Sequence, residues 1–335
     1  MKQHTRTIPP ADPEAYYTYL AERINRDLEE AVSEDFPESL YHPMNYVLAA
    51  QGKRLRPVLL IMSCESVGGT CESAYNAALA IEILHNFTLV HDDIMDNDDL
   101  RRGRETVHKR WNNNVAILAG DGLIALAYRF LLKTRSRDMR RIIRIFSEAI
   151  IKICEGQSID KDMETASTVG LEDYLDMIQR KTSILLSISA EIGGIIGNGT
   201  PEAIETLSSF GLELGTAFQI QDDLLDIISE EAVIGKDLGS DLCNGKKTYP
   251  IILFIERASA KDKERIVNMF STVRSNKKAV ADFRTMLNSY NIISDVIQEV
   301  NRRIYKANEY LIKQKNDISV EYLLHLSEMV RTRTH

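Results

Sequence analysis

Residues 76–96 read NAALAIEILHNFTLVHDDIMD, an apolar run with few polar interruptions that ends in a cluster of aspartates. An apolar run of this length at helical spacing predicts a helix that is buried on most of its sides. The same periodicity occurs in three later segments, residues 140–160, 171–197 and 202–230. The sequence therefore predicts several long helices packed against one another.

Prolines and turn residues agree with this prediction. Residues 58–200 contain no proline, the residue that breaks helix interiors. The turn residues Asn-Gly-Thr-Pro at 198–201 separate two periodic segments, and the alternating polarity typical of strands is scarce. We predict an all-α fold in which residues 1–335 form a single domain, a bundle of roughly ten or more helices around a central group of long ones.

The composition is that of a globular protein, with 44% hydrophobic and 27% charged residues and a formal net charge of −8. Nucleic-acid-binding proteins are usually basic, so the charge argues against that class. The four cysteines form no C-x-x-C pair and no zinc spacing with histidine, which favours reduced thiols and a cytoplasmic protein. The N-terminus lacks the apolar run of a signal peptide, and Asp121 and Glu191 interrupt two candidate spans, so we expect no transmembrane segment.

The pattern D-D-x-x-D occurs twice, as DDIMD and as DDLLD, each at the end of an apolar helical run. Residues i and i+4 of a helix project from the same face, one turn apart. Asp92 therefore pairs with Asp96, and Asp222 with Asp226. An acidic helix face in water remains the alternative for either copy, but two copies in apolar helices make it less attractive.

Carboxylate pairs of this kind suit magnesium. Two like charges at i and i+4 destabilise a bare helix, so a cation is needed to neutralise them. Magnesium is commonly held by one or two carboxylates together with phosphate oxygens, and no thiolate or imidazole cluster competes for a softer metal.

Basic residues accompany both motifs. Arg101 and Arg102 follow the first motif, Lys236 and Lys246 follow the second, and Gly-Lys-Arg-Leu-Arg-Pro stands upstream at residues 52–57. Lysine and arginine bind phosphate oxygens that a metal leaves uncovered. Acidic clusters beside basic clusters therefore predict a metal-bridged phosphate ligand.

Five blocks in this order resemble the trans-type isoprenyl diphosphate synthases: GKRLRP (52–57), EILH (82–85), DDIMDNDDLRRG (92–103), QIQDDLLD (219–226) and GKKTYP (245–250). The chain is most similar to archaeal short-chain geranylgeranyl and farnesyl diphosphate synthases. The resemblance implies the helical isoprenoid synthase fold, with the two motifs facing across a central substrate cavity, and a homodimer. It also implies isopentenyl diphosphate and allylic diphosphates as substrates.

The resemblance assigns a role to each matching residue. It implies about three magnesium ions, with two held by Asp92 and Asp96 and a third by Asp222. Catalysis would involve Asp92, Asp96, Arg101, Lys181, Asp222, Asp226 and Lys236. The allylic diphosphate would be bound by Arg101, Lys181, Thr182, Gln219, Lys236 and Lys246, and isopentenyl diphosphate by Lys53, Arg56, His85 and Arg102.

Some of these residues have a purely structural alternative. His85 alone would more often be a buried core histidine, although it lies about 20° from Asp92 on the helical wheel, which favours a ligand. Lys181 by itself would pass for a solvated lysine, and Gln219 for an internal polar contact. Gly211 and Gly215 are interpreted as glycines that permit close helix packing.

The implied reaction is ionisation of the allylic diphosphate, condensation and loss of a proton. Phe87 and Thr88 lie five and four residues before Asp92. In the family that the chain resembles, an aromatic residue at the first of these positions limits the product to about twenty carbons, so we expect geranylgeranyl diphosphate. A farnesyl or longer-chain product is the alternative, and ordinary core packing is the alternative for Phe87.

Three other readings compete. A class I terpene cyclase would carry a different second metal motif and would lack the block at residues 52–57. A non-catalytic partner subunit would tend to lose aspartates or basic blocks that this chain keeps. A generic acidic metal-binding protein would leave the ordered basic blocks unexplained. The C-terminal Arg331 and Arg333 either close over the substrates or belong to a frayed tail, which is commoner.

Overall fold

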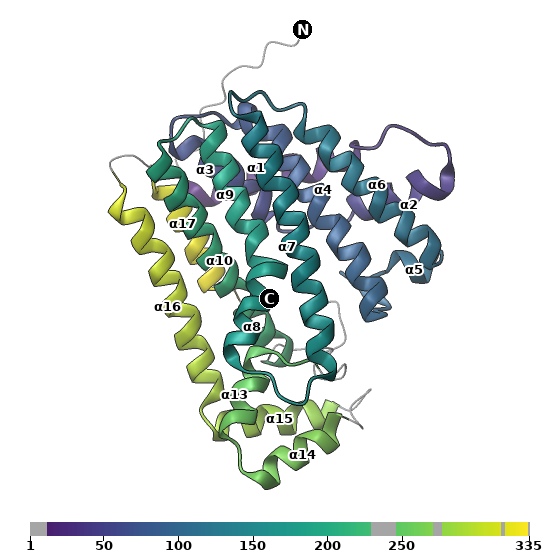
Figure 1. Cartoon of the computed structure of the whole chain (residues 1–335), viewed down its shortest axis with the longest axis vertical. Helices are drawn as coiled ribbons and strands as arrows, with labels where there is room; N and C mark the ends of the chain where they lie inside the picture. Colours follow the sequence, from purple (N-terminus) through teal and green to yellow (C-terminus); the bar gives the residue numbers. More distant parts are fainter. Residues whose placement is uncertain (1–11, 229–245, 271–276, 316–318, 334–335) are drawn as a thin grey trace.

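The computed structural model describes residues 12–228, 246–270, 277–315 and 319–333 (Figure 1). Within these ranges the chain is helical apart from one short antiparallel hairpin, β1 (Leu100–Arg101) and β2 (Arg104–Glu105). The all-α prediction is therefore confirmed.

The described helices follow the sequence in a fixed order. Their bounds are α1 (Pro13–Glu29), α2 (Glu38–Leu48), α3 (Leu55–Ser66), α4 (Cys71–Asp96), α5 (Val107–Arg110), α6 (Asn113–Leu131), α7 (Met139–Thr165), α8 (Leu171–Ile178), the π-helical turn η1 (Gln179–Ser183), α9 (Ile184–Ile196), α10 (Pro201–Ile228), α13 (Tyr249–Arg257), α14 (Ala260–Phe270), α15 (Lys277–Ser289), α16 (Ile292–Lys313) and α17 (Glu321–Arg331).

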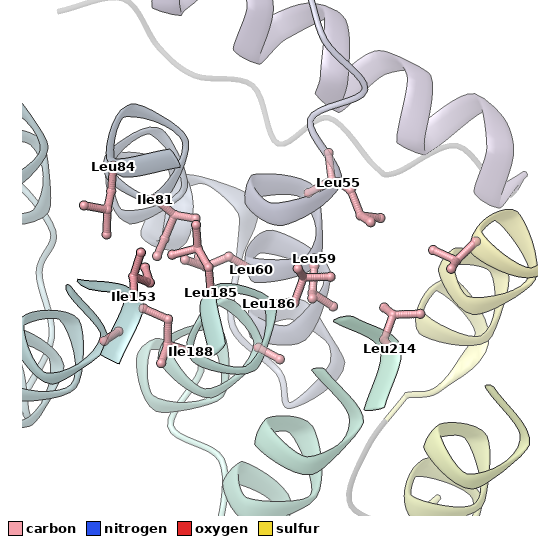
Figure 2. Close-up of a cluster of buried hydrophobic side chains, with 14 of the residues drawn as sticks. Leu55, Leu59, Leu60, Ile81, Leu84, Ile153, Leu185, Leu186, Ile188 and Leu214 are labelled. Carbon is pink, nitrogen blue, oxygen red and sulfur yellow. The ribbon is translucent and has the colours of Figure 1, made fainter. Parts of the chain in front are cut away.

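The long helices form the body of the molecule. In Figure 1, α7, α9 and α10 run side by side, α16 lies along the outside of α10, and α13, α14 and α15 gather at one end. Helix α4 packs against α3 and α6, and α9 packs against α3, α7 and α10. Figure 2 shows the aliphatic cluster that these helices share, with labelled side chains from α3 (Leu55, Leu59, Leu60), α4 (Ile81, Leu84), α7 (Ile153), α9 (Leu185, Leu186, Ile188) and α10 (Leu214). Each such side chain contributes roughly 1.5–3 kcal/mol when it is fully buried.

Helix α9 lies at the centre because glycines let its neighbours approach. A Cβ added at Gly193 of α9 would lie 2.3 Å from the carbonyl oxygen of Leu60, and one added at Gly211 of α10 would lie 2.6 Å from that of Leu186. A Cβ added at Gly215 of α10 would lie 2.7 Å from Cα of Ser183 in η1. No real Cβ sits this close to backbone, so the interpretation of Gly211 and Gly215 as packing glycines is confirmed.

The ends of α4 show how the sequence sets its length. Thr70 and Ser73 form a capping box at the N-terminus, where each side chain bonds to the other residue's backbone N–H. Asn97, with φ 54°, adopts the left-handed conformation at the C-cap. The helix therefore ends at Asp96, and the first aspartate motif occupies its last turn.

Helix α6 is the one described helix that is long and apolar enough to cross a membrane by length and composition alone. Its apolar window is 44% buried inside the protein, and a core helix of a soluble protein passes the same test. Its buried face packs against α4 and α2, while Ile117 and Leu118 remain exposed on the other face.

Replacement of Gly211 by alanine tests the close packing of α9 on α10. The new methyl group must push the two backbones apart, so we expect the free energy of unfolding to fall by about 1–3 kcal/mol. Urea denaturation followed by circular dichroism measures this change.

The matched control is Gly170→Ala at the start of α8, where an added Cβ meets nothing closer than 3.5 Å. This variant should keep its stability within about 0.5 kcal/mol. Equal stability of the two variants would contradict the packing argument.

Candidate active site

In the first aspartate motif, the middle carboxylate and the outer two have different partners. Asp93 is buried and accepts a hydrogen bond of 2.5 Å from Nε of Arg101. Asp92 and Asp96 stand one turn apart on α4; the Asp92 side chain is 21% exposed, whereas that of Asp96 is covered by two lysines. Asp96 has an ammonium group at each oxygen, Lys161 at 2.6 Å from Oδ1 and Lys246 at 2.7 Å from Oδ2. The outer pair thus faces cations, as expected from the i, i+4 spacing.

The second motif, in the last turns of α10, is divided in the same way. Asp223 is buried and accepts hydrogen bonds from the Tyr174 hydroxyl, the Gln219 side chain and the Tyr249 backbone N–H. Asp222 and Asp226 are less buried. Asp222 forms an ion pair of 2.7 Å with Arg333 near the C-terminus.

One short segment links the two motifs. Lys246 reaches Asp96 on α4, and the Tyr249 backbone N–H, three residues later, bonds to Asp223 on α10. The segment between Lys246 and α13 therefore contacts both motifs.

The π-helical turn η1 supplies two more predicted site residues. Gly156 of α7 faces the backbone of Lys181, where an added Cβ would lie 2.4 Å from its nitrogen, so α7 and η1 are in close contact. Lys181 donates to Asp160 of α7 at 2.7 Å and lies 3.9 Å from Asp92. On the other side, the Thr182 hydroxyl donates to the Gln219 side chain at 3.0 Å. The turn therefore joins α4, α7 and α10 at the site.

Cations and burial set the charge state of the first motif. Burial raises the pKa of Asp92, against the opposing effect of Lys181. Burial alone would also raise the pKa of Asp96, but Lys246 and Lys161 hold that pKa well below its usual range. Asp96 is therefore ionised in the free protein.

A second group of basic side chains lies at the N-terminus of α3. Arg54 forms a buried ion pair of 2.6 Å with Glu82 of α4, and this pair fixes the start of α3 against α4. Nη1 of Arg56 lies 3.2 Å from Nε2 of His85. Arg102 is exposed on the hairpin and donates to a backbone carbonyl at 3.1 Å.

The pKa values of this group indicate crowded positive charge. Burial, with the charge of Arg56 next, lowers the pKa of His85 well below its usual range, so its imidazole is neutral. Burial lowers the pKa of Arg56 to about 10. Burial and the charge of Arg333 lower the pKa of Lys53. Cations that are buried beside one another are stabilised by an anion, so this group suits a diphosphate.

The donor set also fits magnesium. Among the described residues, no three His, Cys, Asp or Glu side chains meet closely enough to hold a metal ion by themselves. Pairs of carboxylates beside lysine and arginine side chains suit a metal that takes its remaining ligands from phosphate and water, as magnesium commonly does.

Three further predicted residues are Phe87, Thr88 and Lys236. Phe87 is buried, and its ring stacks edge-on against His91 at 4.8 Å between centroids. The Thr88 hydroxyl donates to the His85 carbonyl oxygen at 2.7 Å. Lys236 lies outside the described residues.

Several residues at the site were not predicted from the sequence. Asp160, Lys161 and Glu164 come from α7. The sequence predicts this helix from its apolar periodicity and gives no sign that its polar residues reach the site. Tyr174 binds the second motif from α8. Their only sequence signal is a polar interruption near the end of an apolar helix, which is common on any surface.

Two hollows are described in this part of the chain. One is lined by two of the predicted site residues, Arg101 and Arg102, together with Asp93, Tyr46 and Asn86, but not by the outer aspartates of either motif. The other, of about 580 Å³, lies among α7, α8, α9 and α10 and is lined by none of the predicted site residues. The central substrate cavity therefore stays a prediction.

Comparison with known proteins agrees with this geometry. Residues 37–288 match the family model described as polyprenyl synthetase. The chain is 35% identical over 316 residues to a short chain isoprenyl diphosphate synthase of Methanothermobacter thermautotrophicus, covering 94% of this chain and 97% of that protein. It is 42% identical over 236 residues to a geranylgeranyl diphosphate synthase of Methanosarcina mazei, covering 70% of this chain and 73% of that protein.

A solved structure extends the comparison to the fold. The crystal structure of geranylgeranyl pyrophosphate synthetase from Pyrococcus horikoshii superposes with a TM-score of 0.86 at 38% identity, covering 96% of this chain and 99% of that chain. The match of fold, sequence and ordered motifs extends over most of the molecule. The chain therefore belongs to the polyprenyl synthetase family, as a short-chain trans-prenyltransferase.

Proposed function

We propose that this chain condenses isopentenyl diphosphate with an allylic diphosphate to give geranylgeranyl diphosphate. The observation that carries the proposal is the presence of two separate groups of basic side chains. Lys181 and Lys246 lie beside Asp92 and Asp96, whereas Arg56 at α3 lies beside the neutral imidazole of His85 on α4. Two diphosphates need two such groups, and a single-substrate cyclase needs one.

The first group suits the allylic diphosphate. Magnesium, which enzymes of this family use in general, would be held by Asp92 and Asp96 and by Asp222, about three ions in all, and would neutralise charge on the leaving diphosphate. Lys181, Lys246 and Arg101 would bind the remaining diphosphate oxygens, with Thr182 and Gln219 as neutral partners. Because these groups are already in place, they stabilise charge that develops as the allylic C–O bond breaks.

The second group suits isopentenyl diphosphate. Lys53, Arg56 and Arg102 would bind its diphosphate with the neutral His85 as a further donor. The double bond of isopentenyl diphosphate then attacks the allylic carbon, and the departing diphosphate accepts the proton whose loss restores an alkene. Holding both substrates in one site replaces a bimolecular encounter.

We also propose that residues 1–335 form one catalytic domain in the cytoplasm. One hydrophobic cluster extends from Tyr16 of α1 to Val330 of α17, which supports a single core. Cys64, Cys71 and Cys154 are free thiols, which suits a reducing compartment.

A homodimer through α6 completes the proposal. Ile117 and Leu118 on this helix are 44% and 55% exposed, and the exposed Ala125 lies two turns further on, with the charged Asp121 between them. Two large apolar side chains exposed side by side on an otherwise packed helix are typical of an interface between identical subunits.

Asp92→Asn and Asp222→Asn test the metal assignment. Loss of one charge from either outer aspartate should lower kcat by about a hundredfold or more, because the developing charge on diphosphate is less well neutralised. Incorporation of labelled isopentenyl diphosphate with a ten-carbon primer measures kcat.

The control for these variants is Asp99→Asn. Asp99 lies in the same acidic stretch but is exposed and pairs only with Lys109 among the contacts described for its side chain. It should keep kcat within about twofold. Near-normal turnover of Asp92→Asn would contradict the metal assignment, and an unmodified protein inactive with every primer would favour a non-catalytic partner subunit.

Phe87→Ala tests the product length. Phe87 lies five residues before Asp92, roughly 7.5 Å along the helix axis. Removal of the ring should let the chain grow past twenty carbons, which reversed-phase chromatography of the dephosphorylated products measures with five-, ten- and fifteen-carbon primers.

Phe130→Ala is the matched control, since Phe130 is equally buried at the far end of α6. It should leave the product distribution unchanged. If Phe87→Ala still stopped at the product of the unmodified enzyme, Phe87 would be ordinary core packing.

The double variant Ile117→Glu, Leu118→Glu tests the dimer. Two charges placed in a buried apolar interface should weaken association by about a hundredfold or more. Sedimentation equilibrium measures it, and Ile312→Glu on α16, at a similarly exposed position of 53%, should remain a dimer. An unmodified chain that sediments as a monomer would overturn this part of the proposal.

A further inference from the structure

Lys161 occupies a position at the first motif that the proposed reaction does not use. It lies near the C-terminal end of α7, and its ammonium group is 2.6 Å from Oδ1 of Asp96. The same ammonium is 2.7 Å from Oε1 of Glu164, one turn further along α7. Lys246 occupies the other oxygen of Asp96 at 2.7 Å. Each oxygen of Asp96 therefore has a lysine ammonium group in contact, and the side chain is only 5% exposed.

A divalent cation that binds Asp96 must displace at least one of these lysines. A carboxylate oxygen that already contacts an ammonium group at 2.6 Å has no room for a metal ion on the same side at an oxygen–metal distance of about 2.1 Å. The protein therefore carries its own competitor for the metal.

We propose that Lys161 competes with magnesium for Asp96 and moves to Glu164 when the metal binds. The inference rests on the proposed function, because it takes Asp96 to be a metal ligand. Lys161 is thus a positioning residue: it holds Asp96 in the metal-free enzyme and weakens metal binding until a diphosphate adds its own oxygens to the metal.

Lys161 is better suited to this movement than its neighbours. Lysine carries three donors on a flexible stem, so it can release one acceptor and keep another. Its side chain is 29% exposed and that of Glu164 is 30% exposed, which leaves both free to rearrange at the rim of the site. Lys181, in contrast, is less exposed, and its ammonium is already bonded to Asp160.

The position of Asp96 explains why a resident cation is useful. Asp96 ends α4, where the free carbonyl groups carry the negative end of the helix dipole. Asp92, one turn earlier, adds a like charge. Without a metal, Lys161 reduces this repulsion, and its removal should destabilise the metal-free protein while making Asp96 more accessible to a metal. These two effects have opposite signs, whereas a merely structural role would weaken both stability and metal binding.

The test measures Mn²⁺ binding to the full chain without any substrate. Mn²⁺ replaces magnesium because its free concentration can be followed by electron paramagnetic resonance. Lys161→Met keeps the length of the side chain and removes its charge, and we expect it to bind Mn²⁺ about fivefold or more tightly than the unmodified enzyme. In the absence of metal its Tm should fall.

Lys152→Met is the matched control. Lys152 is exposed on the same helix, and its replacement changes the net charge equally. It should leave Mn²⁺ affinity within about twofold. If Lys161→Met bound Mn²⁺ no more tightly than Lys152→Met, or more weakly than the unmodified enzyme, the proposal would be wrong.

Two further variants separate this inference from the proposed function. Glu164→Gln removes the negative charge of the second acceptor of Lys161, so it should weaken Mn²⁺ binding, and the weakening should be smaller when Lys161 is already methionine. Asp96→Asn should weaken Mn²⁺ binding in either background. If Asp96→Asn weakens binding but Lys161→Met has no effect, only the role of Lys161 fails. If Asp96→Asn has no effect, the metal assignment fails and the role of Lys161 fails with it.

Discussion

Both aspartate pairs lie in the last turns of long helices, and the rest of the site is arranged around this unfavourable position. The last carbonyl groups of a helix have no partner within it and carry the negative end of its dipole. Asp96 ends α4, and Asp226 lies in the last described turn of α10. Each stands one turn from another aspartate, inside a helix bundle. Ionised carboxylates in such a position need nearby cations.

The fold supplies those cations from segments far apart in the sequence. Lys161 comes from α7, Lys181 from the π-helical turn η1, Lys246 from the segment before α13, and Arg333 from the residues after α17. These segments can converge because glycines bring α9 and α10 together and bring η1 against α7. Helix packing and charge neutralisation therefore depend on each other. A loss of close contact between α9 and α10 would also move Thr182 away from Gln219.

The sequence predicted the parts of the site that lie on single helices. The i, i+4 spacing placed Asp92 and Asp96 on one face, and the structure shows their neighbour Asp93 turned inward to Arg101. The sequence allows His85 to be either a core histidine or a ligand. In the structure it lies beside Arg56.

Ion-pair partners that come together only through tertiary packing could not be predicted from the sequence. Arg54 stands among residues expected to bind diphosphate, but it forms a buried ion pair with Glu82, a partner that no local pattern indicates. Lys161 and Asp160 looked like polar residues near the end of an apolar helix. Position at the end of the chain favours a frayed tail for Arg333, whereas the structure shows it in contact with Asp222.

Helix α6 connects the expected limit of product length with the expected subunit interface. Phe87 stacks on His91, and Nε2 of His91 lies 3.3 Å from the carbonyl oxygen of Ile117 on α6. Gly120 leaves room for the imidazole, since a Cβ there would lie 2.2 Å from it. The ring of Phe87 therefore packs against His91, and the other side of His91 contacts α6. The exposed side of the same helix carries Ile117 and Leu118, which we assign to the proposed dimer interface. In that dimer, a partner subunit packed on α6 would restrict the movement of the helix behind His91 and Phe87, and so would couple the proposed limit on product length to assembly.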